Sequence, residues 1–277
     1  MGKIISVTSG KGGVGKTMST INMALAASKS GSRVLIVDGD LGLSNVDVVM
    51  GLDPRGTLQD VLDGHASVAD IISTTKIGID VISSGTGITK LANMTPLSRS
   101  FLVHELSKLP DFYDFVFVDT GAGISESVLT LNLVSDIFVV VTTPEPHAIT
   151  DAYALIKIMA EEHDRHECAL IVNQTVNSDE GRRVAAKIAD VAKTYCGSQV
   201  HYVGSVSADA NLVRAVLARR VGSDSALSSL CGQGWSQSWC QVLQLLNSGI
   251  FIQRSEGLGS VWQAISAPIG ARQNLDP

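Results

Sequence analysis

The sequence has few of the residues that build disulfide-rich, metal-clustered or membrane-spanning proteins. Its 277 residues include four cysteines, and no two of them form a Cys-x-x-Cys pair, which argues against an iron–sulfur or zinc site and fits a reducing compartment. No apolar run approaches the roughly 18–20 residues that a membrane span requires. Residues 1–7 hold one lysine and a short apolar run, which is not the pattern of a signal peptide, so we expect a cytoplasmic protein.

Positive charge is scarce as well. The chain has 21 lysines and arginines against 27 aspartates and glutamates, which gives a net charge of −6. Generic, charge-driven binding of nucleic acid is therefore not expected, and only a local basic patch could support it. Apolar residues, by contrast, make up 45% of the chain, and there are 26 glycines. This composition excludes a disordered protein and suffices for a buried core in one large domain or two small ones.

The composition changes near Arg220. Residues 221–277 hold only five charged residues, and residues 221–253 hold no lysine or arginine. All three tryptophans of the chain lie in residues 221–277: Trp235, Trp239 and Trp262. We therefore divide the chain into a domain over residues 1–220 and an atypical C-terminal tail over residues 221–277, for which a helix and partial disorder are both open.

Before this point, short β-branched runs alternate with helix-like segments. Most of the runs are near-continuous apolar stretches, as expected of strands buried on both faces. The expected strands are Ile4–Thr8, Val34–Val37, Ile79–Ile82, Phe115–Val118, Ile137–Val141, Ala169–Val172 and His201–Val203. The expected helices are Thr17–Lys29, Thr57–Leu62, Ser98–Leu106, Ala148–Glu162 and Gly181–Cys196. This alternation predicts an α/β fold with a mostly parallel, twisted sheet of about seven or eight strands, helices on both faces and a ligand site at the carboxyl ends of the strands.

A glycine-rich loop joins the first expected strand to the first expected helix. It satisfies the pattern G-x-x-x-x-G-K-[ST] with Gly10, Lys11, Gly12, Gly13, Val14, Gly15, Lys16 and Thr17. The glycines let backbone N–H groups approach phosphate oxygens, and the helix N-terminus adds its partial positive charge. We expect Lys16 to place its ammonium between the β- and γ-phosphates and the Thr17 hydroxyl to bind the metal. The loop, with the following Met18, therefore predicts a site for ATP and Mg²⁺.

Two aspartates at strand ends complete this site. Asp38 follows Val34–Val37, and Asp119 follows Phe115–Val118. A carboxylate at the end of an apolar strand is costly to desolvate unless a cation is near, and Mg²⁺ supplies one. We predict that Asp119 is the Walker B acid, bound to the metal through a water, and that Asp38 orders the same metal shell. The glycine-rich turn after Asp119 would let this loop move when the γ-phosphate leaves.

The extra lysine of the loop, Lys11, points to a family. The form Lys-Gly-Gly-Val-Gly-Lys-Thr resembles the deviant Walker A box of the MinD/ParA family, P-loop NTPases of the SIMIBI class that dimerise with ATP. The resemblance implies that Lys11 reaches across a sandwich dimer to the partner's nucleotide, where it meets the charge that develops in phosphoryl transfer. It also implies that Asp40 orients the attacking water, so that Lys11, Lys16 and Asp40 are the catalytic residues of a slow, partner-stimulated ATPase. A solvated loop lysine is the alternative for Lys11.

The same resemblance implies an adenine site after two later strands. Asn173 stands where relatives use an asparagine to read adenine. Ser207 stands where relatives often carry proline, a departure that weakens the expected contact there, and Asp209 keeps the acid of the family. These three residues complete the predicted nucleotide-binding set.

Within the family, the chain is most similar to the FlhG/FleN group, also called YlxH, which regulates flagellar number and placement. The similarity covers about residues 3–220 and is most specific in Ile149–Lys157, Thr57–Gly64 and Ser84–Gly87. It implies an ATP-dependent homodimer whose partners are an FlhF-type GTPase, flagellar switch proteins and a flagellar transcription regulator. Three alternatives stay open: a MinD-like ATPase that positions the division site, a ParA-like DNA partition ATPase, and a nucleotide-gated scaffold with negligible turnover.

The tail departs from this group, in which a short C-terminal helix binds membrane when ATP drives dimerisation. One apolar face is predicted from residues at helical spacing: Trp239, Val242, Leu243, Leu246 and Ile250. Because no basic residue lies in residues 221–253, attraction to anionic lipid is missing. Peripheral membrane contact, a helix packed on the body of the protein, and a shifted reading frame remain as three interpretations.

Overall fold

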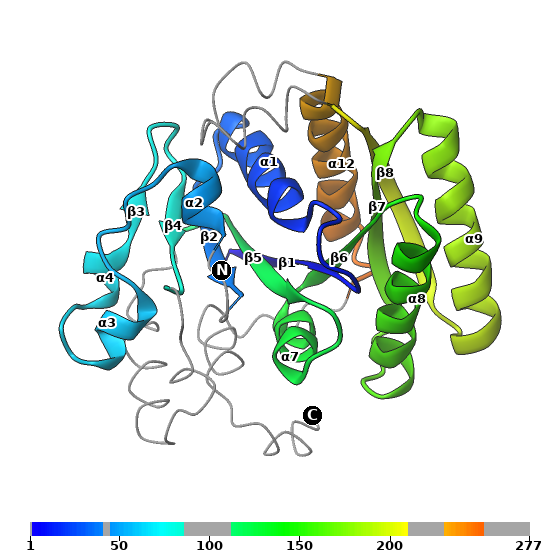
Figure 1. Ribbon diagram of the computed structural model, residues 1–277, viewed down its shortest axis with the longest axis horizontal. Coiled ribbons are helices and arrows are strands. Elements are labelled where there is room, and N and C mark those ends of the chain that lie inside the picture. The colour runs from blue at the N-terminus through cyan, green and yellow to red at the C-terminus, as the bar shows by residue number, and fades with distance from the viewer. Residues whose placement is uncertain (1, 41–44, 86–111, 210–229, 252–277) are drawn as a thin grey trace.

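The protein is described by a computed structural model over residues 2–40, 45–85, 112–209 and 230–251. The predicted helix over Ser98–Leu106 lies outside these residues. Within them, the chain forms one eight-stranded sheet with helices on both faces (Figure 1). The predicted α/β class and strand number are therefore confirmed.

The sheet has the strand order β3-β4-β2-β5-β1-β6-β7-β8, and every pair is parallel except β3 with β4. The strands are β1 (Lys3–Ser9), β2 (Val34–Gly39), β3 (Ser73–Thr74), β4 (Asp80–Ile82), β5 (Phe115–Ala122), β6 (Ile137–Thr142), β7 (Glu167–Thr175) and β8 (Gln199–Ser207). Each of the seven predicted runs contains or overlaps a strand. The two-residue β3 was missed because so short a segment carries no apolar period.

Three of the described helices cover one face of the sheet and five cover the other (Figure 1). The first set is α1 (Lys16–Lys29), α2 (Val46–Met50) and α12 (Leu230–Asn247). The second set is α3 (Leu58–Leu62), α4 (Val68–Ile71), α7 (Glu126–Val134), α8 (Pro146–Glu161) and α9 (Ser178–Cys196). The sequence did not predict α2, α4 or α7. The first two are short, and in α7 the residues Leu129, Leu131 and Leu133 alternate with polar ones as they would in a strand.

Capping residues fix where the short helix α3 begins and ends. The Asp60 carboxylate accepts hydrogen bonds from the backbone N–H of Thr57 (2.7 Å) and from the Thr57 hydroxyl (2.9 Å). Thr57 therefore caps the helix, where the sequence predicted that the helix begins. Gly64 follows the helix with a φ of +74°, a conformation that glycine adopts without strain.

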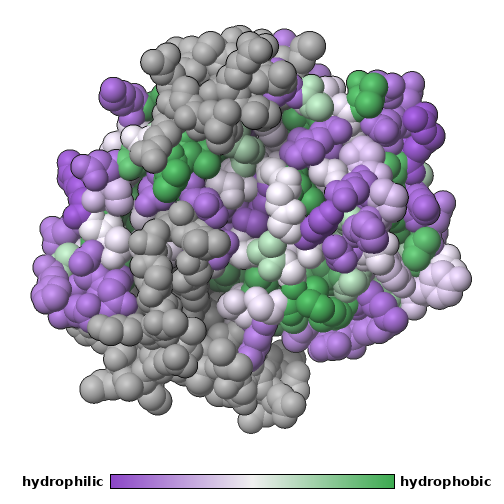
Figure 2. All heavy atoms as spheres, in the orientation of Figure 1, coloured by the Kyte–Doolittle hydropathy of each residue, from purple (hydrophilic) through white to green (hydrophobic). Residues whose placement is uncertain are grey.

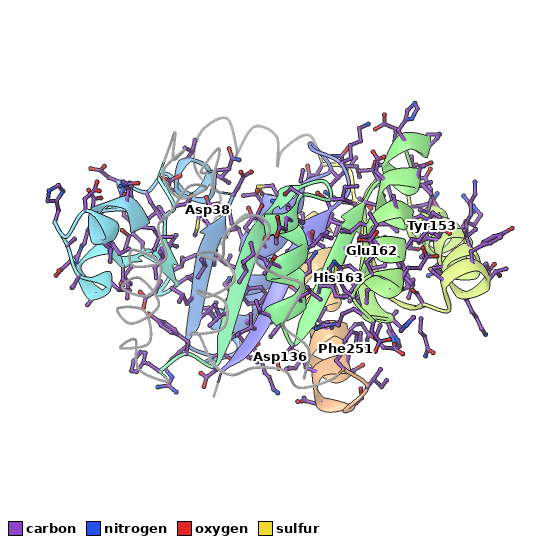
Figure 3. The ribbon with its side chains drawn as sticks, turned by 90° about the horizontal axis from the view of Figure 1, so that it is seen from below. Asp38, Asp136, Tyr153, Glu162, His163 and Phe251 are labelled. Carbon is purple, nitrogen blue, oxygen red and sulfur yellow. The ribbon has the colours of Figure 1, made fainter. Side chains whose placement is uncertain are left out.

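Two buried aspartates lie at opposite ends of the parallel strands, which are called here the amino edge and the carboxyl edge of the sheet. Asp136 precedes β6 at the amino edge, and its carboxylate accepts a hydrogen bond from the backbone N–H of Ile4 (2.8 Å). Asp38 ends β2 at the opposite, carboxyl edge, and Figure 3 shows the two aspartates at opposite ends of the strands. The carboxyl edge is where ligands of parallel sheets bind, so the functional site is sought there.

Helix α12 packs into the same core as the sheet. Trp235 is fully buried, and its indole N–H donates to the hydroxyl of Ser19 in α1 at 3.1 Å. The Trp239 ring lies edge-on to Phe115 of β5, with 4.8 Å between ring centroids. Trp239, Val242 and Leu246 of the predicted apolar face are thus buried, and Leu243 is partly buried. The prediction was wrong for Ile250, which lies beyond the end of the helix at Asn247 and is 44% exposed. Of the three interpretations of the tail, the described part corresponds to a helix packed on the body.

The described surface is mixed. On the face shown in Figure 2, hydrophobic side chains gather in a few patches between hydrophilic ones. None of the described helices is long and apolar enough to span a bilayer.

The packing of α12 predicts a large loss of stability on truncation of its buried tryptophan. Trp235→Ala should lower the free energy of unfolding by about 3–5 kcal/mol, because it opens a cavity and removes the hydrogen bond to Ser19. Urea denaturation measures the free energy of unfolding of wild type and variant. Tyr195→Ala is the control, since Tyr195 is 71% exposed and its loss should change stability by less than about 0.5 kcal/mol. Equal effects of the two substitutions would contradict the packing.

Candidate nucleotide-binding site

The glycine-rich loop lies between β1 and α1 at the carboxyl edge of the sheet. Gly15 precedes the helix with a φ of +88°, which a residue with a side chain would adopt only under strain. A Cβ on Gly10 would lie 2.1 Å from the carbonyl oxygen of Asp151 in α8, so the loop passes too close to that helix for any other residue. By contrast, a Cβ on Gly12 or Gly13 would meet no atom within 4 Å. The loop is held on one side and open on the other, as a phosphate cradle requires.

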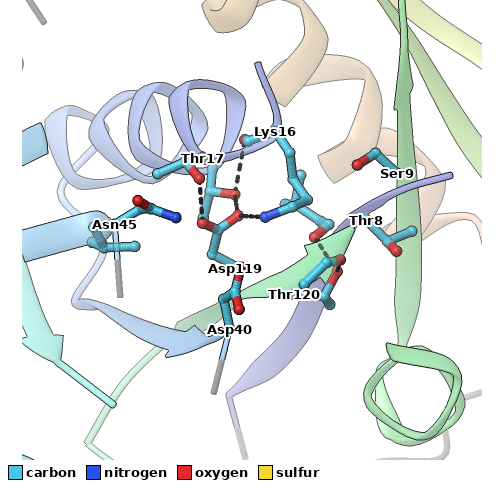
Figure 4. Close-up of polar contacts among 12 residues, drawn as sticks. Thr8, Ser9, Lys16, Thr17, Asp40, Asn45, Asp119 and Thr120 are labelled. Atoms are coloured by element: carbon cyan, nitrogen blue, oxygen red, sulfur yellow. Dashed lines mark hydrogen bonds and ion pairs between the residues drawn. The ribbon is translucent and has the colours of Figure 1, made fainter. Parts of the chain in front are cut away.

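Three side chains of α1 converge on one carboxylate, that of Asp119 in the second half of β5 (Figure 4). The Lys16 ammonium lies 2.9 Å from Oδ1, and the Thr20 hydroxyl donates to the same oxygen at 2.9 Å. The Thr17 hydroxyl donates to the other oxygen, Oδ2, at 2.6 Å. Lys16 and Asp119 are both buried, with exposed fractions of 9% and 1%. Such a desolvated pair is stable only when further hydrogen bonds satisfy it, and the two threonines provide them.

This arrangement fits Mg²⁺ bound together with phosphate. Among the described residues, no group of three or more His, Cys, Asp or Glu side chains could hold a metal ion. Mg²⁺ needs no such cage, because it is commonly bound through one or two carboxylates, water and substrate phosphates. The hydroxyl of Thr17 and the carboxylate of Asp119 are oxygen donors of the type that it prefers, and they lie together beside the open loop.

Asp38 is fully buried, and its carboxylate is engaged by the backbone of the loop that follows β2. Oδ1 accepts a hydrogen bond from the N–H of Asp40 (3.1 Å). Oδ2 accepts hydrogen bonds from the N–H groups of Asn45 (2.9 Å) and Val46 (3.2 Å). Residues 41–44 lie outside the described parts of the chain. Asp38 therefore anchors both ends of this loop and the start of α2, a role that the sequence did not predict. Its part in the metal shell stays a prediction.

Asp40 lies directly after β2, close to the carboxyl end of β5. Its backbone carbonyl accepts a hydrogen bond from the Ser84 hydroxyl at 3.2 Å. Its carboxyl carbon lies 3.9 Å from where a Cβ on Gly121 would be. Figure 4 shows Asp40 beneath Asp119. The predicted water-orienting carboxylate thus belongs to the residue that follows β2, the strand paired with the one that carries the predicted metal ligand.

Lys11 points away from this cluster. Its ammonium forms an ion pair with Glu145 at 2.8 Å, in the loop between β6 and α8. Both side chains are partly exposed, at 33% and 53%. The hydrogen bond and positive charge of Lys11 hold the pKa of Glu145 below its usual value. Exposed pairs of this kind are weak, so Lys11 can leave Glu145 for a stronger anion.

The predicted adenine residues also lie at the carboxyl edge. The Asn173 amide of β7 donates to the backbone carbonyl of Val14 at 2.8 Å, and the next residue, Gln174, donates to that of Gly13 at 3.3 Å. These two hydrogen bonds connect the glycine-rich loop to β7, and the sequence did not predict them. Ser207 ends β8 opposite Thr175 of β7, and Asp209 follows it. Met18 packs partly against the core from α1. Adenine contact by these residues stays a prediction.

Sequence reasoning missed Thr20 and Glu145. Thr20 could have been found, because it lies one helical turn after Lys16 and therefore on the same face of α1. No sequence signal marks Glu145 as the partner of Lys11, since the two come from loops 134 positions apart.

The loop, its lysine and threonine, and a strand-end aspartate on a parallel sheet define a P-loop nucleotide-binding protein. The AAA domain family matches residues 2–172. The antiactivator FleN of Pseudomonas aeruginosa is 36% identical over 218 residues, which are 79% of this chain and 78% of that protein. The flagellum site-determining protein YlxH of Helicobacter pylori is 35% identical over 273 residues, 97% of this chain and 91% of its own. The chain therefore belongs to the AAA domain family and, within it, to the MinD/ParA ATPases.

A solved structure supports the same assignment. The septum site-determining protein MinD of Pyrococcus horikoshii, determined as a complex with Mg-ADP, superimposes with a TM-score of 0.69 and 26% identity. The match covers 91% of this chain and 100% of that one.

The cluster on Asp119 predicts the effect of removing Lys16. Lys16→Met should weaken ADP binding by about 10²-fold or more, because charge-assisted hydrogen bonds to phosphate of roughly 1.5–3 kcal/mol each are lost. Titration with a fluorescent ADP analogue measures the affinity. Lys29→Met is the matched control, since Lys29 ends the same helix at the far side and is exposed. An affinity within a few-fold of wild type for Lys16→Met would rule out the phosphate role of this lysine.

Proposed function

We propose that the protein is an ATP-dependent dimerising switch that hydrolyses ATP slowly and regulates flagellar number and placement. The observation that carries the proposal is the division of labour between two lysines of one loop. Lys16 is buried against Asp119, whereas Lys11 is partly exposed and faces outward to Glu145. In this proposal a monomer would use the first lysine only, because the second is paired with Glu145 and takes no part in the contacts of Lys16, Thr17 and Thr20 with Asp119.

Nucleotide binding would use groups that are already close together. The backbone N–H groups of the loop and the N-terminus of α1 would hold the phosphates. Lys16 would turn from Asp119 to the β- and γ-phosphates, while Thr17 and Asp119 would hold Mg²⁺, directly and through water. Mg²⁺, when bound, supplies charge that neutralises the phosphate oxygens.

Hydrolysis would depend on Asp40. Its carboxylate lies beside Gly121 of β5, and Asp40 directly follows β2, the strand paired with β5. From this position it would accept a hydrogen bond from a water aligned with the γ-phosphate and orient the attack. In the dimer, Lys11 would leave Glu145 and bring its ammonium to the phosphates held by the second copy.

The flagellar role rests on the relatives. One is named an antiactivator and the other a flagellum site-determining protein, and each spans most of this chain. We propose the same role here, with an FlhF-type GTPase, flagellar switch proteins and a transcription regulator as partners. Contact with a membrane would have to use a surface other than the apolar face of α12, which is buried. Positioning of the division site is the second candidate, favoured by the likeness to the MinD structure.

Removing the water-orienting carboxylate should separate binding from hydrolysis. Asp40→Ala should bind Mg·ATP normally, because Lys16, Thr17 and Asp119 remain, and should accumulate as an ATP-bound dimer. Its turnover should fall by about 10²-fold or more, a typical scale for loss of acid–base assistance. Gel filtration with ADP and with ATP, together with phosphate release, measures both effects. Turnover at the wild-type rate would assign the role to another residue.

The action of Lys11 on a second copy can be tested by mixing. Lys11→Ala should bind ATP normally but fail to dimerise, and its stimulated hydrolysis should fall, by up to the roughly 10³–10⁵-fold associated with a cation supplied in trans. When Lys11→Ala is mixed with Asp40→Ala, one site of the heterodimer has both its own Asp40 and the Lys11 of the other copy. Partial recovery of hydrolysis is therefore expected on mixing.

The control is Glu145→Gln, which removes the resting partner of Lys11 and leaves the lysine in place. It should dimerise with ATP at least as readily as wild type. If Lys11→Ala dimerises and hydrolyses ATP as wild type does, the two-lysine proposal is wrong.

A further inference from the structure

Thr20 has a contact that the roles assigned so far do not use. It lies in α1, is fully buried, and its hydroxyl oxygen is 2.9 Å from Oδ1 of Asp119 and 3.2 Å from the backbone carbonyl of Lys16. A hydroxyl has one hydrogen to donate, so these two acceptors compete for it. The bond to the carboxylate is shorter and charge-assisted, which makes it the stronger of the two.

The carboxylate of Asp119 divides its oxygens between two sides. Lys16 and Thr20 lie on Oδ1, whereas Thr17 lies on Oδ2. Thr17 is at the partly exposed start of the helix, and Thr20 is one turn deeper in the interior. The neighbouring hydroxyl of Thr120 does not contribute, because it is directed to the backbone carbonyls of Val7 and Gly121. Oδ2 therefore faces the open loop and Oδ1 faces the core.

Binding of nucleotide would take two of these three donors away. Under the proposed function, on which this step rests, Lys16 turns to the phosphates and Thr17 to the metal. Thr20 would keep its contact with Asp119, because it is buried in α1 one turn beyond the residues that bind the nucleotide. Of the three side-chain donors, it alone would still hold the carboxylate when the metal is present.

We propose that Thr20 is a positioning residue for the Walker B aspartate. By holding Oδ1, it keeps the Asp119 carboxylate in the orientation in which Oδ2 faces the metal and its water, without changing the contact of Lys16 with the phosphates. Without it, Oδ1 would be a buried acceptor without a fixed donor once the metal is bound, and the carboxylate would rotate. Residues that orient a metal ligand in this way typically change metal affinity or activity by 10–100-fold when removed.

The test is the coupling between Mg²⁺ and nucleotide. ADP affinity is measured with a fluorescent analogue in EDTA and in saturating Mg²⁺, and the ratio of the two gives the coupling. Thr20→Val keeps the shape of the side chain and removes the hydroxyl. It should reduce the coupling by about 10-fold or more and raise the Mg²⁺ concentration for half-maximal hydrolysis by a similar factor, while ADP affinity in EDTA stays within about 3-fold. Thr20→Ser, which restores the hydroxyl, should recover most of the coupling.

A matched control separates this role from ordinary helix packing. Thr130 is also buried in a helix, and its hydroxyl donates to the carbonyl of Glu126 four residues before it, as that of Thr20 can to Lys16. Thr130→Val should leave the Mg²⁺ coupling unchanged. Thr20→Ala serves as a second variant without the hydroxyl, should the valine disturb folding.

The outcomes distinguish this proposal from the function on which it rests. If wild type shows no Mg²⁺-dependent binding or hydrolysis, the proposed function fails. If wild type shows both and either hydroxyl-free variant of Thr20 keeps the full coupling, the positioning role is wrong. It is also wrong if Thr20→Ser is as defective as Thr20→Val, because the effect would then come from packing.

Discussion

The structure depends on a buried negative charge at the end of its central strand. β5 lies between β1 and β2, and Asp119 ends its apolar run with only 1% of its surface exposed. A carboxylate so placed must have a cation and hydrogen-bond donors, because its desolvation costs several kcal/mol otherwise. Lys16, Thr17 and Thr20 meet that need from one face of α1. These contacts hold the loop and α1 against the sheet. In the proposed function, Lys16 and Thr17 would exchange the carboxylate for phosphate and Mg²⁺.

The loops around Asp119 are held by contacts of graded strength. Asp38 is fully buried and binds three backbone N–H groups, so the ends of the loop after β2 are firmly anchored. The pair of Lys11 and Glu145 is partly exposed and therefore weak. The proposed switch needs this combination, because its predicted metal and phosphate ligands must be in place before binding, whereas the lysine proposed to act on a second molecule must be able to change partner.

Much of this could be predicted from the sequence, since the strands are near-continuous apolar runs and the glycine-rich loop has a specific pattern. The unpredicted parts have two physical causes. Thr20, Glu145 and Asn173 act through partners 99, 134 and 159 positions away, and local periodicity carries no information on such contacts. Helix α7 was missed because its leucines alternate, so packing against β1 and β5 overrides a strand-like pattern.

The unusual composition after Arg220 is explained in part by where α12 lies. Helix α12 packs beside α1 on the same face of the sheet, and its Trp239 ring lies against Phe115 and Phe117 of β5. Trp235 ends on Ser19, two residues after Thr17, which is the predicted metal ligand. If α1 shifts when nucleotide binds, α12 would therefore shift with it. Helix α12 is thus linked to the proposed nucleotide site through α1, although Trp235 and Ser19 are 216 positions apart in sequence.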